Sequence, residues 1–353
     1  MDKKKAKKNI ILSLGVALGG ISGAAIASYV KIYDGIFPRY ERPNYKLIPG
    51  LVCYDRLKKP IDRKEISFLS NDNLLKGYYY FTKRPKGIVL IAHGIRSGAD
   101  DYLNIIKYMI ENRYNVFSFN YTGTFESEGD STVGMCQSLV DVDNAIEYIQ
   151  SNAEFNRLPL FLLGHSWGGY AVSSVLSLKK NIKACACISS IKNGYTMPLE
   201  KAEQYTGKLS ATAKPFLNTY QKMLFGDYTN YDGVMGINNS NVPVLIAHGV
   251  NDKAVTFEKQ SLVSSKKEIT NKRVVYYIGK GLQDEHVSIL YSIKAIAYQK
   301  IVESEIKLLS IQKGRELNDK EKEDFYKTID HELYSEVNEE LFSSIVLLFD
   351  SLK

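Results

Sequence analysis

Cysteine and the common metal-binding motifs are scarce in this chain of 353 residues. Four cysteines are present. Cys53 and Cys136 are isolated, and Cys185 and Cys187 lie two apart on an expected strand, where they face the same way and cannot easily bridge each other. No C-x-x-C, H-E-x-x-H or phosphate-binding loop motif occurs. We therefore expect buried thiols rather than a disulfide framework, and we expect no metal and no cofactor.

Excess charge is also scarce outside the amino terminus. The chain carries a formal net charge of +7, but residues 1–8 alone hold five lysines and one aspartate. The rest of the chain is therefore nearly balanced, and nothing in it indicates a nucleic-acid surface. A hydrophobic content of 44% with 24% charged residues is ordinary for a globular protein, and the length is sufficient for a large core.

Charged side chains are absent from residues 9–30, which are rich in Ile, Leu, Val, Ala and Gly. About 20 apolar residues span a bilayer as a helix, so this stretch is predicted to be a transmembrane anchor. Because the lysines of residues 1–8 precede it, the positive-inside rule places the amino terminus in the cytoplasm and the remainder outside the cell. The alternative is secretion after cleavage of a signal peptide near Ala25-Ile26-Ala27.

Strands and helices alternate after an irregular connector, which is expected over residues 31–64 because four prolines lie there. The expected strands cover residues 65–70, 74–81, 87–92, 115–120, 158–163, 182–188, 242–247 and 273–278. The expected helices cover residues 100–111, 138–151, 170–178, about 257–266, and 287 onward. This alternation predicts an α/β fold with a mostly parallel sheet covered on both faces, in which active sites gather at the carboxyl ends of the strands.

A strand-to-helix junction carries the clearest chemical motif, Gly164-His165-Ser166-Trp167-Gly168. This is the G-x-S-x-G pattern of a nucleophile elbow. A serine on so sharp a turn takes a strained backbone conformation, and the two chain segments then pass close to each other. Glycine leaves room for that approach two residues before and two residues after the serine. Ser166 is therefore predicted to be a nucleophile.

A serine hydroxyl needs a base, and the base needs an acid that orients it. His286 follows the last expected strand and opens a helix, which is where a base carried on a loop would stand. Asp252 is the only carboxylate in the loop after strand 242–247. The chain order Ser166, Asp252, His286 is the order expected with this elbow. The other histidines are less suitable, since they adjoin the serine, end strands or lie in a charged tail: His165, His93, His248 and His331.

Two backbone N–H groups are needed to stabilise the developing oxyanion. One is expected from Trp167, the residue after the nucleophile. The other is expected from Ile95, in the loop after strand 87–92, where the chain reads His93-Gly94-Ile95.

These motifs together resemble the α/β-hydrolase superfamily, and more narrowly its bacterial branch of serine-aminopeptidase-like and monoacylglycerol-lipase-like proteins. The resemblance covers residues 65–302 and implies a hydrolase domain with a helical cap, expected at about residues 190–240. One segment departs from the pattern. Residues 120–129 are similar to the branch's Asp-Tyr-Arg-Gly-x-Gly-x-Ser-x-Gly, but Thr122 stands for the Arg and Phe125 for the second Gly. The family's Arg contacts in that loop therefore do not carry over.

The expected cap is rich in aromatic and Met side chains, which suit an apolar acyl group or simply bury the underside of the cap. Glu200 and Glu203 there either bind a substrate amine, as an aminopeptidase needs, or form a solvated helix face. Residues 303–353 are predicted to be a helical extension. It packs on the domain, binds the membrane surface or contacts a partner, and the sequence does not choose.

The sequence thus predicts a membrane-anchored serine hydrolase. Its expected substrate is a small-molecule carboxylic ester of acyl or lipid-like character. Peptidase, amidase or acyltransferase activity on the same three residues is the alternative. A further alternative is a membrane-tethered binding protein without catalytic activity. The complete set of catalytic residues argues against it. The oligomeric state is left open.

Overall fold

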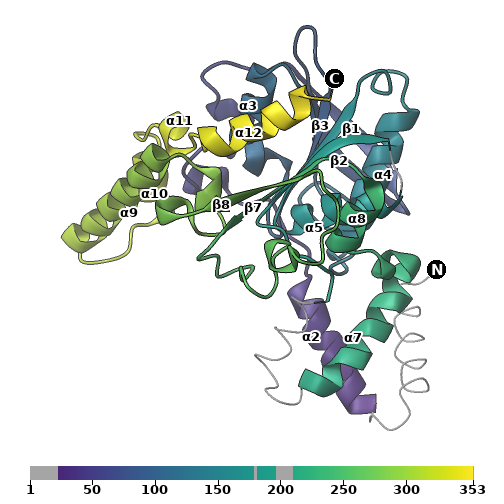
Figure 1. The fold of residues 1–353 in the computed structure, drawn as a ribbon. Helices are drawn as coiled ribbons and strands as arrows, with labels where there is room; N and C mark the ends of the chain where they lie inside the picture. Colours follow the sequence, from purple (N-terminus) through teal and green to yellow (C-terminus); the bar gives the residue numbers. More distant parts are fainter. Residues whose placement is uncertain (1–22, 179–180, 196–209, 353) are drawn as a thin grey trace.

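The computed structural model describes residues 23–178, 181–195 and 210–352. One eight-stranded sheet forms its centre, with the strand order β1-β2-β4-β3-β5-β6-β7-β8 (Figure 1). The first two strands pair antiparallel with their neighbours, and the other pairs are parallel. The strands are β1 (Arg63–Ser70), β2 (Asn73–Tyr80), β3 (Ile88–Ala92), β4 (Asn115–Phe119), β5 (Leu160–His165), β6 (Ile182–Ile188), β7 (Val244–Gly249) and β8 (Val274–Gly279).

Helices cover both faces of this sheet, so its central strands are buried on both sides. In β3, for example, Ile88 and Leu90 belong to one hydrophobic cluster and Val89 and Ile91 to the other, and none of the four is exposed. This explains why the central strands have continuous apolar sequences rather than alternating ones. One face carries α4 (Gln137–Ser151), α5 (Trp167–Ser174) and α8 (Gly233–Ser240), and the other α3 (Leu103–Glu111) and α12 (Glu339–Asp350). The predicted α/β fold is confirmed.

The prediction of a helix at residues 257–266 is wrong. The chain forms irregular turns there, with one short 3₁₀ helix over Val263–Ser265. Side chains capture the backbone in this segment. The N–H of Thr256 donates to the Gln260 side chain at 2.7 Å, and the N–H of Ser264 donates to the Ser261 hydroxyl at 3.0 Å. Such local bonds compete with a helix.

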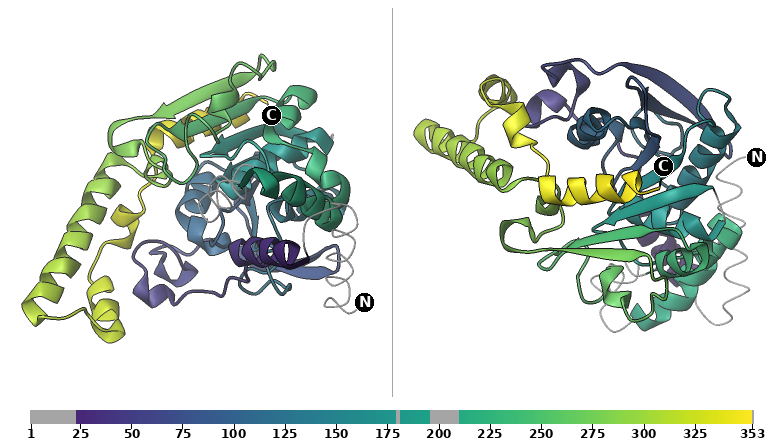
Figure 2. Two further views of the ribbon diagram at one scale, coloured as in Figure 1. Left: turned by 90° about the horizontal axis from the view of Figure 1, so that it is seen from below. Right: turned by 45° about the horizontal axis from the view of Figure 1, so that its top comes forward.

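The carboxyl-terminal extension is part of the domain. α9 (Ile293–Lys313) runs unbroken across residue 302, so the expected boundary there falls inside a helix. α9 and α10 (Asp319–Tyr326) extend away from the sheet, and the chain then returns through α11 (His331–Tyr334) to α12, which lies across the sheet (Figures 1 and 2). Phe349 of α12 is fully buried and stacks on Phe161 of β5 at 4.8 Å between ring centroids. Of the three alternatives, packing on the domain is the one observed.

The predicted membrane segment lies mostly outside the described residues. α2 (Gly23–Ile36) contains its last part and continues past residue 30, so the expected irregular connector begins as a helix. Val30, Tyr33 and Phe37 are buried in the core, and Phe37 packs near Trp167. Apolar side chains on one face of the helix account for this continuation. No helix in the described part of the chain is long and apolar enough to cross a membrane.

The expected cap region contains α7 (Ser210–Phe225) and α8. α7 lies beside α2, and the rings of Tyr33 and Tyr220 meet edge to face at 5.2 Å (Figure 1). Glu200 and Glu203 lie outside the described residues.

Candidate active site

Ser166 lies on the sharp turn between β5 and α5, at the carboxyl edge of the parallel strands. Its backbone has φ 57° and ψ −116°, a conformation that non-glycine residues rarely adopt. The flanking glycines are sterically required. A Cβ on Gly164 would lie 2.3 Å from the carbonyl oxygen of Gly168, and one on Gly168 would lie 2.0 Å from that of Ala92. The serine is thus held in place by contacts that leave no room for side chains.

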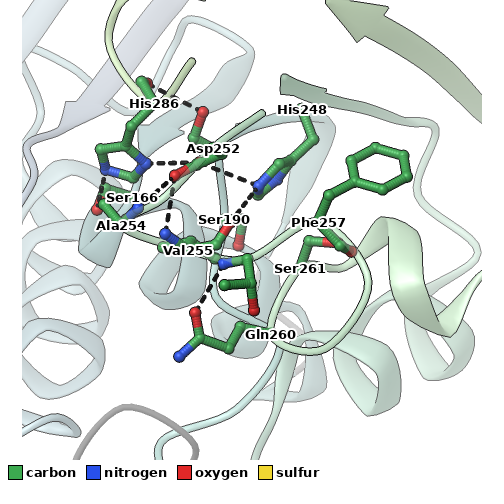
Figure 3. Close-up of polar contacts among 12 residues, drawn as sticks. Ser166, Ser190, His248, Asp252, Ala254, Val255, Phe257, Gln260, Ser261 and His286 are labelled. Atoms are coloured by element: carbon green, nitrogen blue, oxygen red, sulfur yellow. Dashed lines mark hydrogen bonds and ion pairs between the residues drawn. The ribbon is translucent and has the colours of Figure 1, made fainter. Parts of the chain in front are cut away.

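The structure brings together the three side chains that the sequence singled out (Figure 3). The Ser166 hydroxyl lies 2.9 Å from Nε2 of His286, and Nδ1 of His286 lies 2.7 Å from Oδ2 of Asp252. Because a carboxylate only accepts, Nδ1 carries the hydrogen and Nε2 is free to accept the serine proton. Ser166 is 6% exposed and Asp252 4%, so the arrangement is shielded from bulk water.

Asp252 is held in its ionised form by several donors. Its Oδ1 accepts the N–H groups of Ala254 and Val255, each at 2.8 Å. Burial alone would raise the pKa of this carboxyl group, but hydrogen bonds from His248 and His286 outweigh burial and hold the pKa of Asp252 well below its usual range. The Asp252 side chain is therefore ionised, and accepts a hydrogen bond from His286, at any ordinary pH.

His248 was not expected to contribute to the site, yet it contacts the acid directly. Its Nε2 lies 3.1 Å from Oδ2 of Asp252 and 2.9 Å from the carbonyl oxygen of Val255. Both neighbours are acceptors, so Nε2 carries a hydrogen and is shared between them. The carboxylate of Asp252 thus lies between two imidazole rings (Figure 3). The four-residue spacing of His248 and Asp252 across a tight loop was the available signal.

His165 connects the two sides of the site, although it was judged unsuitable as a base. Its Nε2 donates to the carbonyl oxygen of His286 at 3.0 Å, and its Nδ1 accepts from the hydroxyl of Tyr102 at 2.7 Å. That hydroxyl in turn accepts the N–H of Gly94 at 2.9 Å. Burial, together with the nearby His286, lowers the pKa of His165 to about 3. A neutral imidazole therefore links the loop after β3 to the loop that carries His286.

The two remaining histidines have structural partners. His93 is buried, and its Nδ1 donates to the carbonyl oxygen of Gly94 at 2.8 Å, while burial lowers its pKa to about 4. His331 accepts the N–H of Gly50 at 3.2 Å and does not line the cavity above Ser166.

Ile95 and Trp167, the predicted oxyanion donors, both line the cavity above Ser166. Trp167 is the first residue of α5, where a backbone N–H has no partner inside the helix. The N–H of Gly94 is occupied by Tyr102, which leaves Ile95 as the next N–H in that loop. Neither the Ile95 nor the Trp167 N–H is hydrogen-bonded to another of the residues that the structure describes.

The cavity has a volume of about 650 Å³. Its wall is built from the loops after β3, β7 and β8, the start of α5, and one face of α2 that includes Ile32 and Ile36. α2, which begins within the apolar amino-terminal run, therefore forms part of the cavity wall.

The loop formed by residues 120–129 is held by an arginine from outside it, Arg39. The guanidinium of Arg39 donates to the carbonyl oxygens of Ser127 at 3.0 Å, Gly129 at 2.8 Å and Phe125. Thr122 instead donates through its N–H and its hydroxyl to the buried carboxylate of Asp141, at 2.8 and 2.9 Å. Arg39 lies outside the segment that resembles the family, so the sequence pattern did not reveal this replacement.

The comparisons with known proteins agree with this site. The family model described as Serine aminopeptidase, S33 matches residues 83–235, which include the elbow. The uncharacterized protein YfhR of Salmonella typhi is 26% identical over 206 residues, 56% of this chain and 68% of that protein. Human monoglyceride lipase is 29% identical over 93 residues, 26% of this chain and 30% of the lipase.

Among solved structures, an esterase of Pyrococcus furiosus superposes with a TM-score of 0.53 at 16% identity, covering 78% of this chain and 98% of the esterase. At that identity the likeness concerns the fold. The fold and the elbow define a hydrolase of the α/β class. Within that class, residues 83–235 are similar to the branch that the serine aminopeptidase model describes, and this segment makes up less than half of the chain.

Proposed function

We propose that the protein is a serine hydrolase that cleaves carboxylic esters of acyl or lipid-like character. The observation that carries the proposal is the continuous hydrogen-bonded chain from Ser166 through His286 to Asp252, at the carboxyl edge of the sheet and inside a cavity. Nucleophile, base and acid are each at hydrogen-bonding distance, which is the geometry that acyl transfer requires.

The reaction follows from these contacts. Ser166 Oγ attacks the ester carbonyl carbon while Nε2 of His286 takes its proton, and Asp252 stabilises the resulting imidazolium. The N–H groups of Ile95 and Trp167 stabilise the oxyanion. The intermediate then collapses, and the alcohol leaves with the proton from His286. Water attacks the acyl-serine in the same way, and the acid product leaves with Ser166 restored.

The names of the relatives favour esters over amides for this chain. An esterase and a monoglyceride lipase are among the similar proteins, whereas the aminopeptidase description belongs to a family model. The wall residues Ile32, Ile36, Ile95, Trp167 and Val255 offer apolar contacts for an acyl chain.

The test compares ester and amide substrates on the full-length protein in detergent. We expect a series of 4-nitrophenyl esters to be hydrolysed at least tenfold faster than aminoacyl-4-nitroanilides. Asp252→Asn is expected to lower kcat by roughly 10³-fold or more, because the histidine loses the acceptor that fixes its tautomer. Preference for the anilides would contradict the ester assignment, and hydrolysis by Ser166→Ala at the wild-type rate would contradict the whole proposal.

We also infer that residues 9–30 anchor the protein in the cell membrane, with residues 1–8 in the cytoplasm and the catalytic domain outside. The uncharged run and the lysines before it support this inference. Protease added to intact cells should then degrade the domain. Amino-terminal sequencing of the native protein that begins near Ser28 would replace the anchor with a cleaved signal peptide.

A further inference from the structure

Three basic side chains line the cavity above Ser166. Lys31 comes from α2, Arg96 from the loop after β3, and Lys253 from the loop after β7. Each is solvent-exposed. Their positions in the chain place two of them beside the reacting groups, because Arg96 follows the expected oxyanion donor Ile95 and Lys253 follows the acid Asp252. The third stands on the helical wall formed by α2.

No carboxylate of the described residues lines this cavity to balance them. The carboxylate of Asp252 already accepts hydrogen bonds from His286, His248 and two backbone N–H groups. The nearby acids Asp284 and Glu285 line a second cavity, to which Asp252 and Lys253 also contribute. The charge that faces a bound substrate in the described part of the site is therefore positive.

The three cations also have no partners among the residues that the structure describes. None of them takes part in an ion pair or a side-chain hydrogen bond there, whereas other basic side chains near the sheet do. Arg42, for instance, pairs with Glu126 and Asp100, and Lys86 pairs with Asp350 at 2.8 Å. Cations that line a concave site and are not neutralised raise the local concentration of anions.

Arg96 is moreover held in an unusual backbone conformation. Its φ of 65° lies in the left-handed region, which costs a residue with a side chain about 1 kcal/mol or more. A glycine or an asparagine would adopt this turn with less strain, so the local backbone does not account for an arginine here. Arg84 and Arg113 share this conformation outside the cavity, with φ 53° and 66°, so the case for Arg96 rests on its place in the cavity wall.

We propose that the ester substrate carries a negative charge, a phosphate or a carboxylate, close to the scissile bond and within reach of Lys31, Arg96 and Lys253. This deepens the proposed ester hydrolysis and rests on it. The same cations disfavour a substrate with a free amine, which an aminopeptidase would bind through carboxylates. A soluble anionic ester and an anionic lipid share this chemistry, and the experiment separates them.

The experiment uses two matched pairs of esters with the full-length protein in detergent. The soluble pair is mono-4-nitrophenyl adipate and its methyl ester, which differ only in the distal carboxylate. The lipid pair is 1-oleoyl lysophosphatidic acid and 1-oleoylglycerol, which differ only in the phosphate. The measured quantity is the ratio of kcat/KM for the anionic ester to kcat/KM for the neutral one.

The wild-type protein is expected to prefer the anionic member of at least one pair, and the pair that shows the larger preference identifies the source of the charge. Lys31→Met, Arg96→Met and Lys253→Met should each lower that ratio about two- to fivefold, and the triple variant about tenfold or more. Raising the salt from about 0.05 M to 1 M should also lower this ratio, because the Debye screening length shortens to about 3 Å.

Lys83→Met is the matched control. Lys83 is exposed and precedes β3, at the opposite edge of the sheet from Ser166, so the ratio should not change. A wild-type ratio at or below one for both pairs, or a triple variant with the wild-type ratio, would overturn the proposal while leaving ester hydrolysis intact. If the wild-type protein hydrolysed none of these esters in a Ser166-dependent way, that result would contradict the proposed function itself.

Discussion

At the residue scale, the notable feature of the site is that its acid has two histidine neighbours. His286 contacts Oδ2 of Asp252 at 2.7 Å and faces the serine, whereas His248 contacts the same oxygen at 3.1 Å from the buried side. His248 is fully buried and its ring packs edge to face near Phe257 at 6.0 Å. It therefore has a fixed orientation and acts on the serine only through the carboxylate.

Substitution of His248 tests this positioning role. His248→Leu removes one donor to Asp252, and kcat/KM on a 4-nitrophenyl ester should fall about tenfold, because a hydrogen bond to a charged group contributes about 1.5–3 kcal/mol. His248→Gln retains an N–H and should recover most of the activity. Equal activity of wild type and His248→Leu would show that the contact has no role in positioning the acid.

The pH dependence of stability gives a second readout for His248. A carboxyl group with a lowered pKa stabilises the fold above its ordinary range, near pH 4, and this stabilisation is lost as the pH falls. His248→Leu weakens the effect, so its free energy of unfolding should fall less than that of the wild type between pH 5 and pH 3. A purely steric role for the ring predicts the same pH dependence for both proteins.

His165 makes a separate contribution to acid sensitivity. Its pKa is lowered to about 3 in the folded protein, whereas an unfolded histidine titrates near 6.5. The unfolded state therefore binds the proton first as the pH falls, and the fold loses about 2 kcal/mol by pH 5 from this group. His165→Gln does not titrate, so urea unfolding at pH 7 and pH 5 should show a smaller difference for the variant. An unchanged difference would contradict the buried neutral imidazole.

At the element scale, the carboxyl-terminal helix is the least expected part of the fold. Leu341, Phe342, Ile345 and Phe349 are all fully buried on the sheet face. Tyr114 extends the contact, since its hydroxyl donates to Asp350 at 2.7 Å and its ring meets Phe349 at 5.9 Å. α12 thus completes a layer that α3 alone would leave open.

Truncation of one side chain measures that contribution. Phe349→Ala should lower the free energy of unfolding by about 3–4 kcal/mol, because a fully buried aromatic ring is replaced by a cavity. Leu347→Ala on the same helix is the control, since Leu347 is 69% exposed and its loss should cost less than about 1 kcal/mol. Equal small effects for the two variants, measured by urea unfolding, would indicate that α12 is not part of the core.

The sequence predicted the elements whose signals are local. Apolar runs of five or six residues marked β3 and β5, and the glycines around Ser166 marked the elbow, because their requirements are met by neighbouring residues. Residues 257–266 were assigned wrongly for the opposite reason, since serine and glutamine side chains there bond the backbone in turns. Periodicity alone does not show that competition.

The contacts that the sequence missed join distant segments. Arg39 bonds carbonyl oxygens nearly ninety residues away, and the Tyr102 hydroxyl meets His165 across two strands. Such pairs leave no spacing pattern in one chain. Chain order did select Ser166, Asp252 and His286, which the fold brings into contact, because each lies just after a strand at the same edge of a parallel sheet.

At the scale of the whole molecule, loops at the carboxyl edge of the sheet, the start of α5 and one face of α2 converge on the cavity above Ser166. α2 supplies Lys31, Ile32 and Ile36 to its wall, and three separate loops carry Ser166, Asp252 and His286. The central claim is that this cavity is an acyl-transfer site with Ser166 as its nucleophile.

That claim is tested most directly by mass spectrometry after labelling with a fluorophosphonate. The probe phosphonylates a serine only when a base activates its hydroxyl. We expect stoichiometric labelling of the peptide that contains Ser166 in the wild-type protein, at least a hundredfold slower labelling in His286→Gln, and no labelling of that peptide in Ser166→Ala. Labelling of Ser166→Ala at the wild-type rate, or a wild-type protein modified at another residue, would contradict the account.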